Sequence, residues 1–243
     1  MRAQSGNVVL IDALLPRRHI DSIVTRVLTD AALMFGFAWF VALSAQIAVR
    51  LPWTTVPVTG QTFAVLVTGG ALGARRGAGA LILYALMGIF AIPVFAPSTG
   101  ALGLTGEWGF RFIFPWLGTS GDIWNLSSGG YIVGFILAAY LVGRFAERAW
   151  DRKPWGVLVM LASNALVYVP GLLWLFYLIS SGWVPLGASQ PIGEFIAGSG
   201  TLDKTLKGGL YPFIAGDLMK IYLATVTLPF AWTLVDRFKR SEE

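Results

Sequence analysis

The stretch WGVLVMLASNALVYVPGLLWLFYLI, residues 155–179, is 25 residues long and contains no Asp, Glu, Lys or Arg. A helix needs roughly 20 predominantly apolar residues to cross a bilayer, so this stretch predicts a transmembrane helix. Five further apolar segments predict helices at about 27–49, 61–74, 77–92, 129–145 and 210–235. The expected fold is therefore all-α: a polytopic membrane protein with six transmembrane helices.

The composition of the whole chain supports this class. Of its residues, 56% are hydrophobic and 13% are charged, whereas soluble domains carry about 45–50% and about 25%. These values exclude a soluble enzyme, and the segments lack the alternation of apolar and polar residues typical of membrane β-barrels. Six spans would occupy about 120 residues, which leaves no room for a separate soluble catalytic domain.

The basic residues predict how the chain is oriented. In the predicted topology, 13 of the 18 Lys and Arg residues lie on the side of the two termini and four lie on the opposite side. Cytoplasmic loops carry an excess of Lys and Arg, so both termini are predicted to be cytoplasmic. The two long loops, with apparent insertions at about 106–126 and 180–200, then face outward.

The expected organisation has three parts. Residues 1–25 form a cytoplasmic N-terminal segment, 26–236 a six-helix substrate-binding membrane domain, and 237–243 a cytoplasmic tail. The first residues lack the apolar core of a cleavable signal peptide. Residues 7–15 are either a short amphipathic helix or a loose tail.

Two charged residues, Asp217 and Lys220, fall inside the last predicted helix. Three positions apart, they lie on one face of that helix. A charge at bilayer depth costs roughly 2.5–3.5 kcal/mol, so the pair is expected to face an internal cavity rather than lipid. Intramembrane charges usually mark a substrate site, and the alternative is a buried structural ion pair.

Uncharged polar residues provide further candidates. The segment VPVTGQT at 56–62 is expected to be extended, and its Thr59 and Gln61 offer hydrogen-bond donors and acceptors. Irregular backbone is tolerated at membrane depth where it lines a cavity. Asn164, inside the 155–179 helix, is either a site residue or a group that bonds between helices.

Several kinds of chemistry are excluded. The sequence has no Cys, and its one histidine, His19, lies in the N-terminal segment, so no catalytic residues and no metal site are expected in the membrane. Residues 198–205, GSGTLDKT, resemble a phosphate-binding loop, but Asp203 stands where glycine is required. We therefore expect no enzyme, no ATPase motif, no cofactor and no nucleic-acid partner. A purely structural membrane subunit is the alternative to a substrate-binding protein.

Four blocks of sequence carry a family resemblance. They are VPVTGQTFAVLVTGGALGARRGAGALILYALMGIFAIPVF at 56–95, GGYIVGFILAAYLVG at 129–143, YVPGLLWL at 168–175 and GLYPFIAGDLMK at 209–220. In order and spacing the chain resembles the BioY family, the biotin-binding S components of energy-coupling-factor (ECF) transporters. The two outer-loop insertions depart from the family pattern.

The resemblance implies a function and partners. It implies capture of external biotin, the transported ligand, by a multi-pass protein in the cytoplasmic membrane of a prokaryote. The implied partners are a coupling protein (the T component) and two cytoplasmic ATPases, which would energise uptake. An S component for another small vitamin and a stand-alone slow biotin facilitator are the alternatives.

The resemblance also implies roles for individual residues. Asp217 and Lys220 would bind the ureido ring of biotin, and Ala38 and Ala42 of an AxxxA pattern would meet the coupling protein. The candidate apolar walls for the rest of the ligand are aromatic: Phe95, Tyr131, Tyr168 and Trp174. The candidate donors for the biotin carboxylate are Thr59, Gln61, Ser128 and Arg111.

Overall fold

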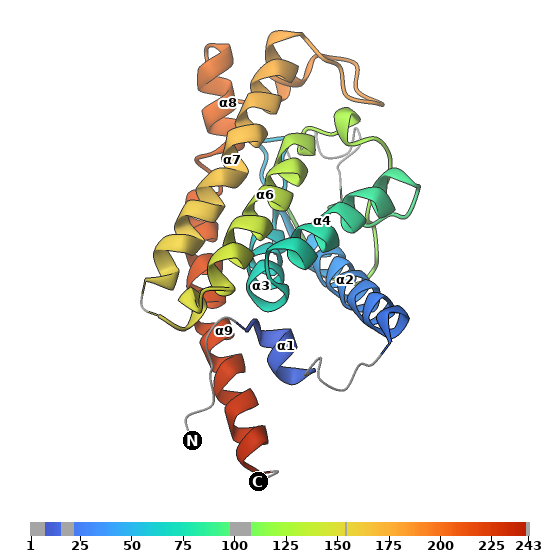
Figure 1. Ribbon diagram of the computed structural model, residues 1–243. Coiled ribbons are helices and arrows are strands. Elements are labelled where there is room, and N and C mark those ends of the chain that lie inside the picture. The colour runs from blue at the N-terminus through green and yellow to red at the C-terminus, as the bar shows by residue number, and fades with distance from the viewer. Residues whose placement is uncertain (1–7, 16–21, 98–107, 154, 242–243) are drawn as a thin grey trace.

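The computed structural model describes residues 8–15, 22–97, 108–153 and 155–241. This part of the chain is mostly helical (Figure 1), and its elements are α1 (Leu10–Leu14), α2 (Ile23–Gln46), β1 (Ala48–Arg50), β2 (Val58–Thr59), α3 (Gln61–Leu72), α4 (Ala74–Ile89), β3 (Gly109–Arg111), η2 (Ile123–Asn125), α6 (Gly129–Ala146), η3 (Trp150–Arg152), α7 (Gly156–Ser180), η4 (Ile192–Phe195), α8 (Thr201–Gly209) and α9 (Ile214–Ser241).

Within the described residues, four helical segments are long and apolar enough to cross a membrane. They are α2, α6, α7 and the run Thr201–Lys239, which contains α8 and most of α9. With 12 and 16 residues, α3 and α4 are shorter than the roughly 20 residues that a full span needs. The membrane class predicted from composition therefore agrees with the structure, while four helices rather than six meet the length of a span.

Each of the six predicted helical segments overlaps one observed helix. The largest differences concern the last one, which begins at Ile214 and extends to Ser241. The residues before it, expected to belong to a loop, instead form α8. As a result Asp217 lies in the first turn of its helix rather than one and a half to two turns inside it.

Close helix packing depends on small residues. A β-carbon at Gly69 of α3 would lie 2.5 Å from the carbonyl oxygen of Ala139 in α6. A β-carbon at Gly134 of α6 would lie equally close to the carbonyl oxygen of Val167 in α7, at 2.5 Å. Small side chains let helix backbones approach this closely, so Gly69 and Gly134 serve contacts between helices of the same chain.

Ala38 and Ala42, the predicted docking residues, lie inside the chain in this structure. Both side chains are completely buried, and they belong to the main apolar cluster of the protein. The AxxxA pattern here packs α2 inside the chain, because small side chains favour close intramolecular packing as much as association.

A small sheet lies beyond the end of α2, and its strand order is β2-β1-β3. Both pairings are antiparallel: Val49 lies opposite Val58 on one side and opposite Phe110 on the other. An extended segment was predicted from residue 56, where β2 lies, but β3 was not predicted. β3 comes from the 106–126 insertion, and such a long-range pairing leaves no local pattern in the sequence.

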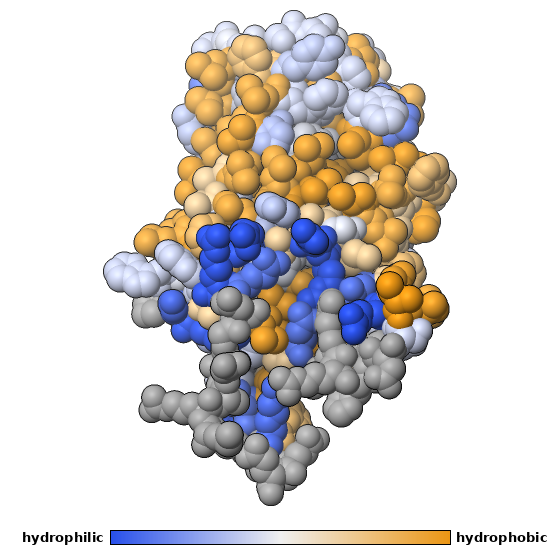
Figure 2. Space-filling view, viewed as in Figure 1, coloured by the Kyte–Doolittle hydropathy of each residue, from blue (hydrophilic) through white to orange (hydrophobic). Residues whose placement is uncertain are grey.

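The first helix, α1, and the C-terminal end of α9 lie at the same end of the molecule (Figure 1). There α1 is held by Asp12, which accepts two hydrogen bonds from the Arg76 guanidinium at 2.9 and 2.7 Å. Of the two interpretations of residues 7–15, the amphipathic helix is therefore supported, packed against the protein. Figure 2 shows a broad apolar band across the middle of the molecule and hydrophilic side chains below it, on the side of α1 in Figure 1.

A buried polar contact joins the α6–α7 connection to α9 at this end. Trp232 donates its indole N–H to the carboxylate of Asp151 at 2.7 Å. The guanidinium carbon of Arg152 lies 3.4 Å from the centroid of the same indole ring. Burial raises the pKa of the Asp151 carboxyl, and the hydrogen bond from Trp232 opposes that shift.

Candidate functional site

A polar cavity lies between α3, α4, α6, α7 and α9, below the sheet. Its volume is about 50 Å³. Its lining combines one acid and one amine with hydroxyl, amide, aromatic and aliphatic groups: Val56, Pro57, Thr59, Gln61, Thr62, Tyr84, Phe95, Ala96, Ser128, Tyr131, Ile132, Phe135, Val167, Tyr168, Phe213, Asp217 and Lys220. We call it the inner cavity.

Asp217 is the most highly connected polar group of the inner cavity. Its carboxylate accepts hydrogen bonds from Tyr168 at 2.5 Å, from Lys220 at 2.9 Å and from Thr62 at 3.2 Å. These donors come from α7, α9 and α3, and Asp217 itself is 4% exposed. Its place in the first turn of α9 also sets the carboxylate near the positive end of the helix dipole. The predicted pair therefore faces the interior and borders a hollow.

A second polar group lies where the sheet meets α3. Gln61, the first residue of α3, donates its amide N–H to the hydroxyl of Tyr84 at 2.8 Å. The hydroxyl of Thr59 donates to the Gln61 amide oxygen at 2.9 Å. Both predicted polar residues thus line the inner cavity, and each already has a partner there.

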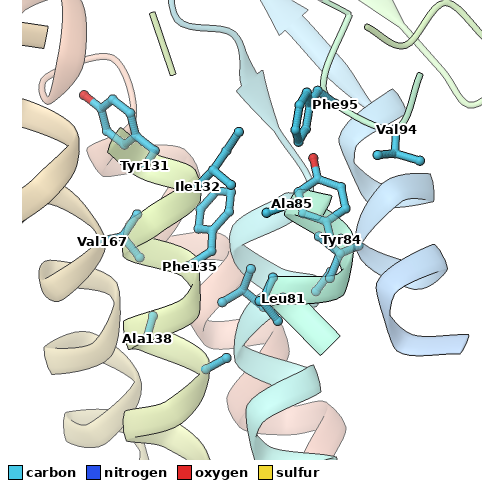
Figure 3. Packing of buried hydrophobic residues seen from close by; sticks show 14 of the residues in the cluster. Leu81, Tyr84, Ala85, Val94, Phe95, Tyr131, Ile132, Phe135, Ala138 and Val167 are labelled. Carbon is cyan, nitrogen blue, oxygen red and sulfur yellow. The ribbon is translucent and has the colours of Figure 1, made fainter. Parts of the chain in front are cut away.

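Aromatic rings close much of the inner cavity. Figure 3 shows Ile132 and Phe135 projecting from α6 toward Tyr84 on α4, with Phe95 beside the Tyr84 hydroxyl. The rings of Tyr84 and Phe95 meet edge to face, with centroids 5.6 Å apart. Gly88 makes room for this arrangement, because a β-carbon there would lie 2.1 Å from the Phe95 ring.

The predicted Tyr131 and Tyr168 also line the inner cavity. Their rings meet edge to face at 6.1 Å. The Tyr131 hydroxyl donates to the carbonyl oxygen of Gly209 at 2.8 Å. This bond joins α6 to the end of α8, shortly before α9, the helix that carries Asp217.

Three predicted residues lie elsewhere. Trp174 donates its indole N–H to the carbonyl of Leu126 at 2.9 Å and does not line the inner cavity. Asn164 is buried one turn from Tyr168 and also lies outside the lining. Arg111 lies on β3, where it lines a separate surface cavity. For these residues the sequence established the type of group but not the direction in which it points.

Several lining residues were not predicted as site residues. They include Thr62, Tyr84, Ala96, Ile132, Phe135, Val167 and Phe213. Helices that are apolar on every side carry no periodic signal that separates inward from lipid-facing positions. Only Tyr84 offered a hint, since a buried phenol in an apolar helix needs a hydrogen-bond partner.

A larger cavity opens above the first, at the end of the molecule opposite α1. Its volume is about 510 Å³, and Thr119, Asn125, Ser127 and Trp183 are among its lining residues. It shares four lining residues with the inner cavity: Pro57, Phe95, Ala96 and Ser128. We call it the outer cavity. A ligand that entered from this end would pass the shared residues before it reached Asp217.

The arrangement is suited to holding a small, mostly apolar molecule with a polar head. The carboxylate can accept from N–H groups and the ammonium can donate to a carbonyl, both as charge-assisted hydrogen bonds. Apolar and aromatic walls with a few convergent polar groups are typical of small-molecule sites. Among the described residues, no group of three His, Cys, Asp or Glu side chains is placed to hold a metal ion.

Comparisons with known proteins identify the family of this chain. The sequence profile of the BioY family matches residues 17–237. A Thermotoga maritima protein described as biotin transporter BioY is 27% identical over 181 residues, which cover 73% of this chain and 82% of that protein. A Rhizobium etli protein of the same description is 28% identical over 189 residues, covering 78% and 84%.

A solved structure shows the same fold. The crystal structure of the S-component for biotin from an ECF-type ABC transporter matches with a TM-score of 0.60 and 17% sequence identity, over 89% of this chain and 93% of that one. The family profile covers most of the sequence, and the curated relatives are matched along most of their lengths. The chain therefore belongs to the BioY family.

Proposed function

We propose that this protein is a biotin-binding S component, which captures external biotin for uptake energised by partner ATPases. The observation that carries the proposal is the Asp217–Lys220 pair, held 2.9 Å apart at the edge of an aromatic-walled hollow. The names of the relatives, which describe biotin transporters, support the same ligand. Those names describe transport proteins, so the chain is not an enzyme.

The ureido ring of biotin suits this pair. It presents two N–H donors and one carbonyl acceptor, so the Asp217 carboxylate would accept from the N–H groups and Lys220 would donate to the carbonyl. A carboxylate has about four lone-pair sites, and three of them are occupied by Tyr168, Lys220 and Thr62. Binding would use the remaining site and displace the longest contact, from Thr62 at 3.2 Å.

In the proposed complex, the ligand occupies both cavities, with one part in each. The inner cavity, at about 50 Å³, is smaller than the roughly 300 Å³ at which ligand pockets begin. The outer cavity, at about 510 Å³, is large enough. We therefore place the ureido ring at Asp217 and the carboxylate tail in the outer cavity, with the tail near Ser127 and Ser128. Phe95 and Ala96, which border both spaces, would have to shift as the ring enters.

Thr59, Gln61, Phe95, Tyr131 and Tyr168 complete the proposed binding site. The first two supply polar groups, and the rings supply walls for the thiophane ring and the aliphatic tail. The positions of Asn164 and Trp174 outside the lining support an indirect role for each, through helix packing and through the outer loop.

The proposed topology has six membrane helices with both termini in the cytoplasm. The basic residues near both ends of the sequence support it, as does the position of α1 and the C-terminal end of α9 at one end of the molecule. The domain would comprise residues 26–236, with 1–25 and 237–243 on the cytoplasmic side of a prokaryotic inner membrane. Its partners would be an ECF T component and two ATPases. The ATPases would supply the energy for uptake, because this sequence shows no ATPase motif.

Equilibrium binding of radiolabelled biotin to the purified chain in detergent tests the proposal. Saturable binding that unlabelled biotin displaces and thiamine does not is the expected result, because Lys220 would repel a cationic vitamin. Displacement by thiamine at concentrations similar to those of biotin would favour an S component for another vitamin. Failure of the folded chain to bind biotin would overturn the assignment.

A further inference from the structure

The outer cavity is larger than the tail of biotin requires. In the proposed function, on which this inference rests, the ureido ring lies at Asp217 and the tail enters the outer cavity. That tail has about seven non-hydrogen atoms, which at about 30 Å³ each, as in liquid water, would fill about 210 Å³. The volume of the outer cavity is about 510 Å³, so more than half of it is left for the atoms of a longer ligand.

The charge of the outer cavity does not match a carboxylate. None of the described residues that line it is a Lys, Arg or His. Residues 98–107, which lie outside the described part of the chain, contain no basic residue in the sequence either. The charged side chain of the lining is Asp122, directly before η2. A ligand that ends here in a carboxylate therefore meets an acid and no balancing cation.

The basic residues of the outer segments are placed elsewhere. Arg50 and Arg111 line a separate surface cavity. Lys204 donates a hydrogen bond to the carbonyl oxygen of Gly193 at 2.6 Å, and Lys207 lies 2.8 Å from a carboxylate of its own helix, α8. One of these side chains would have to leave its present position before it could balance a ligand carboxylate in the outer cavity.

Hydroxyl groups in the outer cavity already donate to backbone carbonyls. Ser127 donates to the carbonyl of Thr55 at 3.1 Å, and Thr119 donates to that of Ala96 at 2.9 Å. With their protons engaged, these oxygens can accept from an N–H group but cannot donate to a carboxylate. The positive end of the α6 dipole, beside Ser128, suits the carbonyl oxygen of a carboxylate or an amide alike.

We propose that the chain also binds amides of biotin that carry an ammonium group at the far end of an alkyl chain, and that Asp122 selects for them. The amide carbonyl would lie near Ser128, and the amide N–H would face the hydroxyl oxygens of Ser127 and Thr119. The alkyl chain would occupy the remaining volume, next to apolar residues such as Trp183. The ammonium would reach the Asp122 carboxylate, and the attraction of these opposite charges would separate a cationic ligand from a neutral one of the same length.

Calorimetric titration of the detergent-purified full chain at low salt tests this inference with three ligands: biotin, N-pentyl biotinamide and 5-(biotinamido)pentylamine. The two amides differ only in the terminal ammonium group. We expect the neutral amide to bind within about threefold of biotin, because no cation in the cavity loses a partner. The cationic amide should bind at least about threefold more tightly than the neutral one, as expected of a partly exposed ion pair.

Variants of Asp122 identify the group responsible. Asp122→Asn should abolish the preference, so that the two amides bind within about 1.5-fold of each other, whereas Asp122→Glu keeps the charge and should keep the preference. The matched control is Asp203→Asn, which removes an outer acid that lines neither cavity and should leave the preference unchanged. Binding of the neutral amide with unmodified affinity shows that each variant is folded. In the unmodified chain, about 0.5 M salt should reduce the preference without any substitution.

Three results would overturn the inference. A neutral amide that binds more than about tenfold more weakly than biotin would reveal a carboxylate-binding group in the cavity. Equal affinities of the two amides for the unmodified chain would exclude selection by charge. An equal loss of preference in Asp122→Asn and Asp203→Asn would show a general effect of outer charge. Failure of the folded chain to bind biotin itself would instead overturn the proposed function, so the two failures are distinguishable.

Discussion

The substitution Asp217→Asn tests the central feature of the site. It keeps the size of the side chain but removes the negative charge that accepts hydrogen bonds from Tyr168, Lys220 and Thr62. A hydrogen bond to a charged group is worth about 1.5–3 kcal/mol. Loss of one such bond to the ureido ring corresponds to about 10- to 100-fold weaker binding of biotin, at about 1.4 kcal/mol for each factor of ten.

Isothermal titration calorimetry of the purified chain with biotin measures this loss. The matched control is Asp203→Asn, which removes the acid of another helical acid–lysine pair, 2.8 Å from Lys207 and outside both cavities. Exposed pairs contribute about 0–1 kcal/mol, so the control should bind biotin within about twofold of the unmodified chain.

The fold of each variant must be checked separately, because Asp217→Asn leaves the Lys220 ammonium without its carboxylate partner. Thermal unfolding in the same detergent shows whether the variant is folded at the temperature of the titration. A folded Asp217→Asn variant with the biotin affinity of the unmodified chain would refute the reasoning. The pair would then be an ion pair that holds α9 in place and nothing more.

Three further predictions concern stability. Lys220→Met leaves the Asp217 carboxylate without its ammonium partner and should cost about 3–5 kcal/mol of unfolding free energy. D217N/K220M removes both charges and should recover the melting temperature but not biotin binding. A double variant that melts as low as the single one would contradict this. Gly69→Ala forces a methyl against the α6 backbone and should cost about 1–3 kcal/mol, while Gly36→Ala, which meets nothing within 4 Å, should not lower the melting temperature. Burial raises the pKa of the Asp151 carboxyl above its value in the unfolded chain, so folding favours the protonated acid. The stability that this preference contributes is complete below about pH 4 and is lost as the pH rises through the folded-state pKa. The melting temperature of Asp151→Asn relative to the unmodified chain should therefore increase from about pH 4 to about pH 7, and a difference independent of pH would exclude this role.

Local patterns explain what could be predicted from the sequence. Long uncharged stretches predict helices in lipid because every backbone polar group must be satisfied within the segment. The spacing of Asp217 and Lys220 places them on one helical face whatever surrounds that helix. The ends of the helices were predicted to within a few residues, except for α9, which begins after the unexpected α8 and continues to Ser241.

Contacts between distant segments explain what could not be predicted. Thr62 and Tyr168 meet the Asp217 carboxylate from two other helices, 155 and 49 positions away in the sequence. Nothing local to either residue indicates that contact, because an apolar helix gives no sign of which side faces inward. The same holds for the burial of Ala38 and Ala42, since a small residue suits a contact within the chain as well as one with a partner.

The sequence by itself determined that the protein is a helical membrane protein with an acid and an amine kept in its interior. Hydropathy and charge are properties of each residue, and the cost of placing a charge in lipid applies in any arrangement of the helices. Only the tertiary structure decided which hydroxyls contact Asp217, that two cavities meet at Phe95, and that β3 joins the sheet beside Arg50. These features depend on which helix faces pack together, and that is settled by the shape of the whole core.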